Sequence, residues 1–309
     1  MQAYHEALEN ILRNGTQRGD RTGTGTISLF GMQQRYNLAE GFPAVTTKRL
    51  AWKSVVSELL WFIEGSGDER RLAEILYGDR DARTDHGILK PTIWTDNATA
   101  PYWKSKAKFE GDLGRVYGVQ WRRWRTPVEH KGYSFKDDFG NVYNRQGTLH
   151  VREVDQLIEL INGIKADPHG RRHILSSWNP GELQDMALPP CHCFAQFYVA
   201  DGRLSCQMYQ RSCDMFLGVP FNIASYSLLT AMIAQVCGLQ VGEFVHVLGD
   251  AHIYLNHVEQ VKEQLTREPL PAPTLWLNPD IMDITKFTMS DIRLENYQCH
   301  NAITAPMAV

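Results

Sequence analysis

Cys191 is the residue whose type and setting most directly offer covalent chemistry. It follows Pro189 and Pro190 at the start of a strand-like segment. A free cysteine most often packs as a small core residue, whereas a nucleophile needs a cationic neighbour that lowers the pKa of its thiol. Successive side chains of a strand point to opposite faces, so His192 is poorly placed as a base and Arg211 is the better neighbour. These residues alone leave both interpretations open.

Three groups of arginines could hold an anionic ligand, because the guanidinium fork suits bidentate contact with phosphate. For each group, a salt bridge or a solvated basic edge is the alternative interpretation. The Gly/Thr-rich loop that carries one of them lacks the Lys-Ser/Thr ending of a P-loop. The groups are Arg211 with Ser212, Cys213 and Asp214; Arg171 with Arg172; and Arg21 within 20–26.

Two polar residues lie within strongly apolar helical patterns. Glu58 is at the edge of the apolar face of a helix predicted for 52–63. Burial there would raise the pKa of its carboxyl group and suit it to proton transfer near neutral pH; a solvent-facing glutamate is the alternative. Asn222 is in the first turn of a helix predicted to begin at Pro220. Its amide can read a ligand edge that shows N–H and C=O together, as uracil does, or can cap or bridge the core.

A further polar group follows a strand predicted at 244–248. His252 and Tyr254 would share one side if that strand continued, and both could bond to sugar hydroxyls. His252 could instead bind a metal ion with Asp250 and His257, but the sequence shows no further ligand set of closed geometry. The six cysteines include one C-x-C pair and no second pair at zinc-site spacing. We therefore expect reduced thiols and no metal.

The elements that must position these residues follow from hydrophobic periodicity. Asp201-Gly202 separates two strand patterns and predicts a hairpin, because such a turn requires positive φ. Gly31 is predicted to divide 27–38 into a pair of strands. The polar segments 66–110 and 126–150 are predicted to be surface insertions, the second a loop or hairpin. Helices are predicted at 3–12, 52–63, 154–164, 220–237 and 254–267, with a short one near 70–76, and strands at 173–178, 194–199, 204–210, 244–248 and within 275–297.

Composition limits the class of protein. The 309 residues are 43% hydrophobic, which is enough for a large core, and the formal net charge of −3 argues against nucleic acid as the main ligand. The N-terminal segment lacks the apolar core of a secretory signal, and no uncharged apolar run reaches the ~18 residues of a membrane span. We expect one mixed α/β domain over 1–309, located in the cytoplasm.

Taken together, these segments resemble thymidylate synthases over nearly the whole chain outside the two insertions. Blocks of this number and order exclude a chance match. The resemblance implies an α+β fold in which helices pack on a large mixed sheet, and a homodimer that joins sheet to sheet with shared active sites. The blocks are 20–26, 41–43, 46–48, 58–62, 92–94 and 111–114, and most densely 188–192, 210–214 and 216–226.

The resemblance also implies a reaction. Cys191 attacks C6 of dUMP, and C5 then takes the methylene of 5,10-methylenetetrahydrofolate, with no metal and no flavin. Loss of the C5 proton and of tetrahydrofolate leaves an exocyclic methylene, which hydride from the folate reduces to give dTMP and dihydrofolate. Glu58 relays protons, Tyr117 supports removal of the C5 proton, and Arg211 holds phosphate beside the thiol. Implied substrate contacts are Arg21, Arg171 and Arg172 (from the partner subunit), Arg211, Ser212, Cys213, Asp214, Asn222, His252, Ile253 and Tyr254; implied folate contacts are Asp214, Trp94, Gly218, Ala51 and Ala308, the last in a tail that closes over the ligands.

The chain departs from the usual family pattern mainly around the folate side and the tail, which puts the folate-handling step in doubt more than dUMP binding. A dUMP hydroxymethylase, in which water instead of hydride traps the methylene, is therefore the nearest alternative. A dCMP enzyme is disfavoured by Asn222, a nucleotide- or RNA-binding regulator by the full catalytic set, and a cysteine hydrolase by the lack of a placeable His–Asp pair. The departures are Ala51 for His, Gly67-Asp68 for Thr-Asn, Arg115 for Pro, Asn301 for Pro and Thr304 for Lys.

Overall fold

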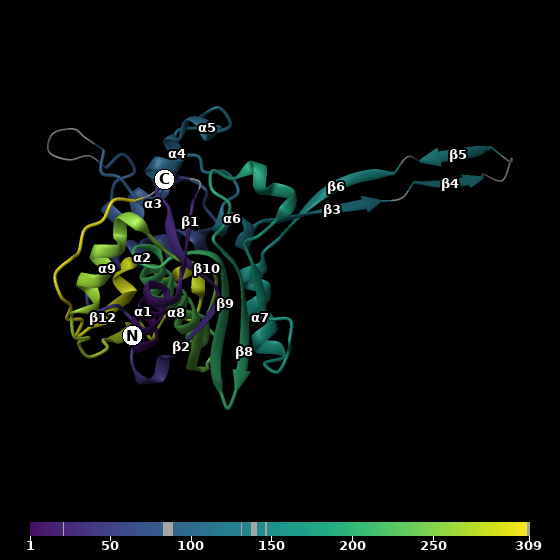
Figure 1. Ribbon diagram of the computed structural model, residues 1–309. Helices are drawn as coiled ribbons and strands as arrows, with labels where there is room; N and C mark the ends of the chain where they lie inside the picture. Colours follow the sequence, from purple (N-terminus) through teal and green to yellow (C-terminus); the bar gives the residue numbers. More distant parts are fainter. Residues whose placement is uncertain (21, 83–88, 131, 137–140, 146, 308–309) are drawn as a thin grey trace.

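The computed structural model describes residues 1–20, 22–82, 89–130, 132–136, 141–145 and 147–307. Helices cover one face of a six-stranded sheet, and a two-stranded arm projects from the body (Figure 1). The helices are α1 (Gln2–Asn14), α2 (Trp52–Glu64), α3 (Glu69–Tyr77), α4 (Thr95–Thr99), α5 (Pro101–Lys104), α6 (Tyr117–Arg122), α7 (Gln156–Ala166), α8 (Gly218–Val236) and α9 (Val258–Leu265). The strands are β1 (Thr16–Arg18), β2 (Thr26–Asn37), β3 (Trp124–His130), β4 (Tyr133–Lys136), β5 (Val142–Arg145), β6 (Thr148–Val154), β7 (Ile174–Ser176), β8 (His192–Ala200), β9 (Arg203–Asp214), β10 (Gln240–Tyr254), β11 (Thr274–Leu277) and β12 (Ile292–Glu295).

The large sheet is mixed, in the order β1-β2-β10-β9-β8-β7. β9 and β10 run parallel, while β8 is antiparallel to β9 and β2 is antiparallel to β10. The carboxyl ends of β9 and β10 therefore meet the amino ends of β8 and β2 at one edge of the sheet. Chain segments that are far apart in the sequence come together there, which confirms the expected mixed α/β fold.

The core lies between the sheet and its helices. α8 is apolar on every side and almost wholly buried, because it packs between β9 and β10 on one side and α2 on the other. Among the described residues, α8 alone is long and apolar enough to cross a membrane, and most of it lies inside the protein. α1 covers β2 and β10 next to it through Tyr4, Leu8 and Ile11, which are fully buried.

Most predicted elements are confirmed, including the hairpin turn, where Asp201 and Gly202 take φ of 50° and 69°. The predicted break at Gly31 is wrong. β2 is one strand, and Gly31 takes a φ of 80° between two residues that keep their pairing with β10. Glycine can adopt this conformation without a side-chain clash, so it kinks the strand locally and does not end it. The predicted helix at 254–267 is shorter than expected, because β10 continues to Tyr254 and a 3₁₀ turn (Leu255–His257) precedes α9, which ends at Leu265.

The two predicted insertions differ in structure. The first contains α3, near the predicted short helix, and also α4 and α5, which periodicity missed because they have five and four residues. The second is a hairpin, as one of the two alternatives predicted. β3 pairs with β6, and β4 pairs with β5 further out along the arm (Figure 1).

Candidate active site

Cys191 lies directly before β8, at the sheet edge where the four strand ends meet. It is half-buried, and its thiol is free. Its backbone N–H donates to the hydroxyl of Tyr117 over 2.7 Å, and its carbonyl accepts the N–H of Arg211 over 2.8 Å. The backbone of Cys191 is thus held between a phenol from α6 and the end of β9.

Arg211 is fixed beside this cysteine. Its guanidinium donates to the carbonyls of Pro189 and Pro190, both over 2.8 Å, and lies 5.4 Å from the ring centre of Trp178. The two prolines fix the backbone that presents these carbonyls. The predicted pairing of Arg211 with Cys191 is therefore present.

The effect of Arg211 on the thiol differs from the prediction. Burial raises the pKa of Cys191, and Arg211, Tyr117 and Ser212 only partly oppose it. A low-dielectric setting disfavours the thiolate more than one shared guanidinium favours it. The expectation of a lowered thiol pKa is thus wrong for this structure, although Arg211, the predicted neighbour, acts in the predicted direction.

Glu58 is buried on α2, and its carboxylate accepts the indole N–H of Trp94 over 2.7 Å. Burial raises the pKa of Glu58 to about 7, and the bond from Trp94 partly offsets the effect. The interpretation of Glu58 as a desolvated acid is confirmed, and the solvent-facing alternative is wrong. A carboxyl group with this pKa can both donate and accept a proton near neutral pH.

Replacing Glu58 with glutamine is expected to stabilise the fold at pH 8 and much less at pH 4.5. The folded-state pKa of Glu58 is raised, so its contribution to stability is full below its ordinary pKa of 4.5 and is lost as the pH rises through about 7. Glutamine removes this loss, which is worth up to about 3 kcal/mol. Urea unfolding at both pH values measures the effect. Glu9→Gln, on the exposed face of α1, is the control, and equal gains at both pH values would contradict the assignment.

His192 is not a base for Cys191, as predicted. It is buried, and its Nδ1 lies 2.7 Å from the hydroxyl of Tyr226. Burial, aided by His246, lowers the pKa of His192 to about 3, so the ring is neutral. It stacks on Tyr117 with ring centres 4.1 Å apart and thereby supports the phenol that bonds to Cys191.

Asn222 is half-buried near the start of α8 and belongs to a chain of amide hydrogen bonds. Its Oδ1 accepts from Nε2 of Gln210 over 3.0 Å, and Oε1 of Gln210 lies 2.9 Å from Nε2 of His246. The bond from Gln210 therefore fixes the position of Oδ1 in the side-chain amide of Asn222. The roles of Gln210 and His246 were not predicted from the sequence. One signal was present: Gln210 follows Leu204, Cys206 and Met208 on the same face of the strand, and it is the polar residue in this apolar series.

The ends of β9 and β10 bring the other polar candidates together. His252 pairs with Asp214 across the two parallel strands, and the ring of Tyr254 lies 5.1 Å from that of His252. Asp214 accepts two backbone N–H groups at the start of α8. Next to them, the Gly/Thr-rich loop bonds to Leu255 and lines a cavity of about 450 Å³.

The remaining candidates divide into four sets. Cys213 and Ile253 are fully buried, so only their backbones could touch a ligand. Gly218 lies close to Asp214 and Asn222: a Cβ atom added to this glycine would be 3.7 Å from a side-chain atom of each. Exposed candidates are Ala51, which precedes α2, and Arg171 and Arg172, between α7 and β7; Arg21 and Ala308 lie outside the described residues.

The fold and this sheet edge define an α/β protein in which a half-buried cysteine lies among polar side chains at the ends of the central strands. Among the described residues, no three His, Cys, Asp or Glu side chains are arranged to hold a metal ion. The chain belongs to the thymidylate synthase family: the family model described as Thymidylate synthase matches residues 2–309. This match confirms the resemblance seen in the sequence. At the level of the family, it supports transfer of a methylene unit from methylenetetrahydrofolate to dUMP.

Proposed function

We propose that this protein is a thymidylate synthase, which converts dUMP and 5,10-methylenetetrahydrofolate to dTMP and dihydrofolate in the cytoplasm. The observation that carries the proposal is the half-buried thiol of Cys191 beside Arg211, at an edge that also holds Asn222 and the Glu58–Trp94 pair. All six cysteines are free thiols, as suits a reducing compartment.

In the proposed reaction, the sulfur of Cys191 bonds to C6 of the uracil ring and its thiol proton leaves to solvent or a base. The electron pair of the C5–C6 bond moves toward C5 and O4, so that C5 bonds to the folate methylene while the bond from that methylene to N10 breaks and N10 takes a proton. The C5 proton is then lost to a base, the bond from the methylene to N5 breaks, and tetrahydrofolate leaves. Hydride from tetrahydrofolate adds to the exocyclic methylene, which gives the methyl group and dihydrofolate. The C6–S bond finally breaks and frees Cys191.

Glu58 and Tyr117 are suited to the proton transfers. The pKa of Glu58, raised by burial to about 7, allows the carboxyl group to give and take a proton through water. Burial raises the pKa of Tyr117 well above its usual value, so the phenol stays neutral and acts through its hydroxyl beside Cys191.

Asn222 and the sheet edge select dUMP. With Oδ1 bonded to Gln210, the amide Nδ2 is oriented to donate to the O4 carbonyl of uracil, and Oδ1 keeps a lone pair for N3–H. Arg211 and Ser212 hold the phosphate, together with Arg21 and with Arg171 and Arg172 of the second protomer; His252 and Tyr254 contact the sugar.

Trp94 favours the synthase over the hydroxymethylase. Its side chain is 5% exposed and packs edge-on against Tyr117, with ring centres 5.8 Å apart. Aromatic surface at this position keeps water from the exocyclic methylene, which hydride must reach first.

Identification of both products tests the proposal. The protein is incubated with dUMP and 5,10-methylenetetrahydrofolate, and the pyrimidine and folate products are separated by mass. dTMP with equimolar dihydrofolate supports the synthase. Hydroxymethyl-dUMP with tetrahydrofolate would identify the hydroxymethylase, and binding of dUMP without turnover would identify a regulator.

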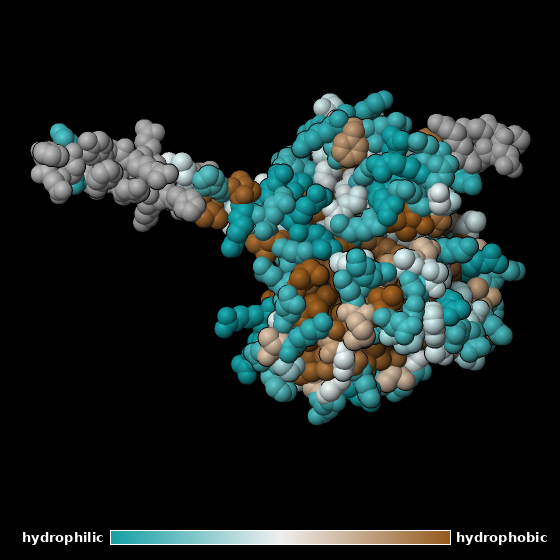
Figure 2. Space-filling model, turned by 180° about the vertical axis from the view of Figure 1, so that it is seen from behind, coloured by the Kyte–Doolittle hydropathy of each residue, from teal (hydrophilic) through white to brown (hydrophobic). Residues whose placement is uncertain are grey.

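The open face of the large sheet supports a homodimer. Aromatic and aliphatic side chains protrude from it, and hydrophobic groups gather on the body seen from behind (Figure 2). A patch of this kind commonly marks an interface. The most exposed of these residues are Phe30 (83%) on β2, Tyr198 (64%) and Phe194 (38%) on β8, and Ile174 (45%) on β7.

Replacing Tyr198 with lysine is expected to produce monomers and to abolish turnover. The new charge would be buried without a partner in a sheet-to-sheet contact, and a monomer lacks the second protomer's Arg171 and Arg172. Analytical ultracentrifugation at several concentrations measures the mass. Phe109→Lys, at a residue that is 52% exposed outside the sheet, is the matched control. A Tyr198→Lys protein that stays dimeric and active would refute this interface.

A further inference from the structure

A buried carboxylate outside the candidate active site holds the turn that carries Trp94. Glu69, the first residue of α3, is 9% exposed. Its Oε1 accepts two hydroxyl groups, from Thr92 over 2.6 Å and from Thr95 over 2.7 Å. These threonines stand on either side of Trp94, more than twenty residues along the chain from Glu69. One oxygen atom therefore fixes both ends of a four-residue turn.

The turn passes this constraint to the indole ring. The Thr92 hydroxyl that donates to Glu69 also accepts the backbone N–H of Trp94 over 3.1 Å, and the Thr95 hydroxyl accepts the N–H of Thr92 over 2.9 Å. The Trp94 indole then donates to Glu58 over 2.7 Å. A series of hydrogen bonds therefore links Glu69 to the Thr92–Thr95 turn and to the backbone N–H of Trp94. The indole ring of Trp94 extends this series to Glu58.

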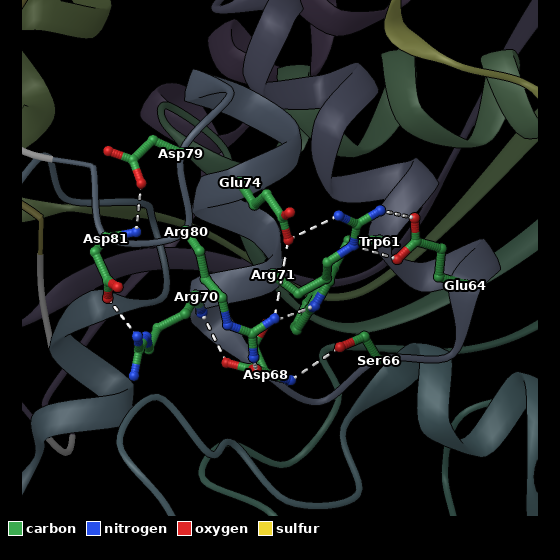
Figure 3. Close-up of polar contacts among 10 residues, drawn as sticks. All are labelled: Trp61, Glu64, Ser66, Asp68, Arg70, Arg71, Glu74, Asp79, Arg80 and Asp81. Atoms are coloured by element: carbon green, nitrogen blue, oxygen red, sulfur yellow. Dashed lines mark hydrogen bonds and ion pairs between the residues drawn. The ribbon is translucent and has the colours of Figure 1, made fainter.

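Hydrogen bonds and ion pairs fix the position of α3, the helix that carries Glu69. Asp68 caps the helix and pairs with Arg80, and its carbonyl accepts the indole N–H of Trp61 over 2.9 Å (Figure 3). Arg71 donates to both carboxylate oxygens of Glu64 on α2, over 2.8 and 2.7 Å (Figure 3). α3 is therefore tied to α2, the helix that carries Glu58, so Glu69 and Glu58 belong to one rigid frame.

We propose that Glu69 is a positioning residue, which holds the Thr92–Thr95 turn so that the Trp94 indole stays hydrogen-bonded to Glu58. This role rests on the proposed function, in which Glu58 moves protons. A carboxylate suits the position because it accepts two hydroxyl groups at one oxygen, and an apolar side chain would leave both without this partner.

The inference predicts the sign of a pH effect. The Trp94 donor lowers the pKa of Glu58, so loss of that bond raises this pKa further above about 7. Mere removal of the negative charge of Glu69 would have the opposite effect, because a nearby anion raises the pKa of another acid. The other titratable groups that interact with Glu58 are Tyr117 and Tyr226, and burial keeps both neutral by raising their pKa values well above the usual range.

Glu69→Leu and Glu69→Gln test the proposal, since glutamine keeps an oxygen acceptor and leucine does not. The first readout is the ¹⁵N-indole NMR signal of Trp94, assigned by its loss in Trp94→Phe. We expect Glu69→Leu to move this signal, to lower kcat about 10- to 100-fold with little change in KM for dUMP, and to shift the Glu58 limb of the pH profile upward. Glu69→Gln keeps the oxygen acceptor and loses only the charge, so it should retain the parent Trp94 signal and should not shift the pH limb upward.

An unmoved Trp94 signal in Glu69→Leu, or a pH limb shifted downward, would overturn the proposal. If Glu69→Leu does not fold, Thr95→Val removes one of the two hydroxyl groups, with Thr95→Ser as its control, and the same two outcomes decide. The NMR readout needs no turnover. An enzyme that makes no dTMP but whose Trp94 signal moves as expected would therefore refute the proposed function and leave the positioning of Trp94 by Glu69 in place.

Discussion

Cys191→Ser is expected to reduce turnover of dUMP by a factor on the order of 10⁵ while leaving dUMP binding measurable. The attack on C6 saturates one bond of a pyrimidine ring, which needs a soft, readily ionised nucleophile, and a serine hydroxyl is a far weaker one. In the proposed site, binding of dUMP depends on Asn222, Ser212 and the arginines, which the substitution leaves in place. Product formation and isothermal titration with dUMP measure the two effects.

Cys237 provides the matched control. It is also a half-buried free thiol, but it lies at the far end of α8 and contacts the carbonyl of Ile161. Cys237→Ser should keep full turnover. If Cys191→Ser retained turnover comparable to this control, the covalent mechanism would fail, whereas loss of both turnover and dUMP binding would mean that the substitution disturbs the site as a whole.

The raised thiol pKa makes the reactivity of Cys191 depend on pH. Burial outweighs Arg211, so alkylation of Cys191 by iodoacetamide should still accelerate as the pH passes 9.0, the ordinary cysteine value. Arg211 donates to two proline carbonyls, so its guanidinium is shared between them and the thiol.

Periodicity and composition predicted the scaffold because each signal there is local. α2 and α8 have long apolar patterns, and the turn at Asp201-Gly202 requires the positive φ that these residues tolerate. Such arguments need no knowledge of which elements become neighbours. They did not decide Glu58, because its place at the edge of the apolar face of α2 fits a solvent-facing glutamate better than a buried one.

The parts that escaped prediction depend on contacts between distant segments. Gln210 and His246 orient Asn222 from two different strands, and Glu69 reaches a turn more than twenty residues away. The pKa of Cys191 likewise depends on burial together with Tyr117 of α6 and with Arg211 and Ser212 of β9. A single sequence shows the residue types in these networks and not their partners.

One departure from the family pattern has a structural explanation. Arg115 is buried and pairs with Glu182 at 2.5 Å, while Gln120 donates to the same carboxylate oxygen over 2.7 Å. The backbone N–H of Arg115 also donates to the carbonyl of Asp185, a bond that proline could not make. The charge at this position is therefore compensated within the fold, and Arg115 gives no reason to doubt folate handling.

Asn222→Asp is expected to shift the preference from dUMP toward dCMP by a factor on the order of 10³ in the ratio of kcat/KM values. In the parent protein, Gln210 donates to Oδ1 of Asn222 and so turns Nδ2 toward the ligand, where it can donate to O4 of uracil. Aspartate keeps the acceptor for Gln210 but replaces that donor with an oxygen. It then repels the O4 carbonyl of dUMP and accepts from the exocyclic amine of cytosine.

Competition binding and product analysis with both nucleotides measure this shift, and Asn222→Ser separates its causes. Serine is too short to reach the base, so it should weaken discrimination without creating a preference for dCMP. Gln210→Glu adds a second, independent check, because a carboxylate there removes the donor to Oδ1 and frees the Asn222 amide to rotate. If Asn222→Asp still preferred dUMP by the parent ratio, the amide would not be what reads the pyrimidine edge, and the hydrogen-bond chain from His246 through Gln210 would serve the core alone.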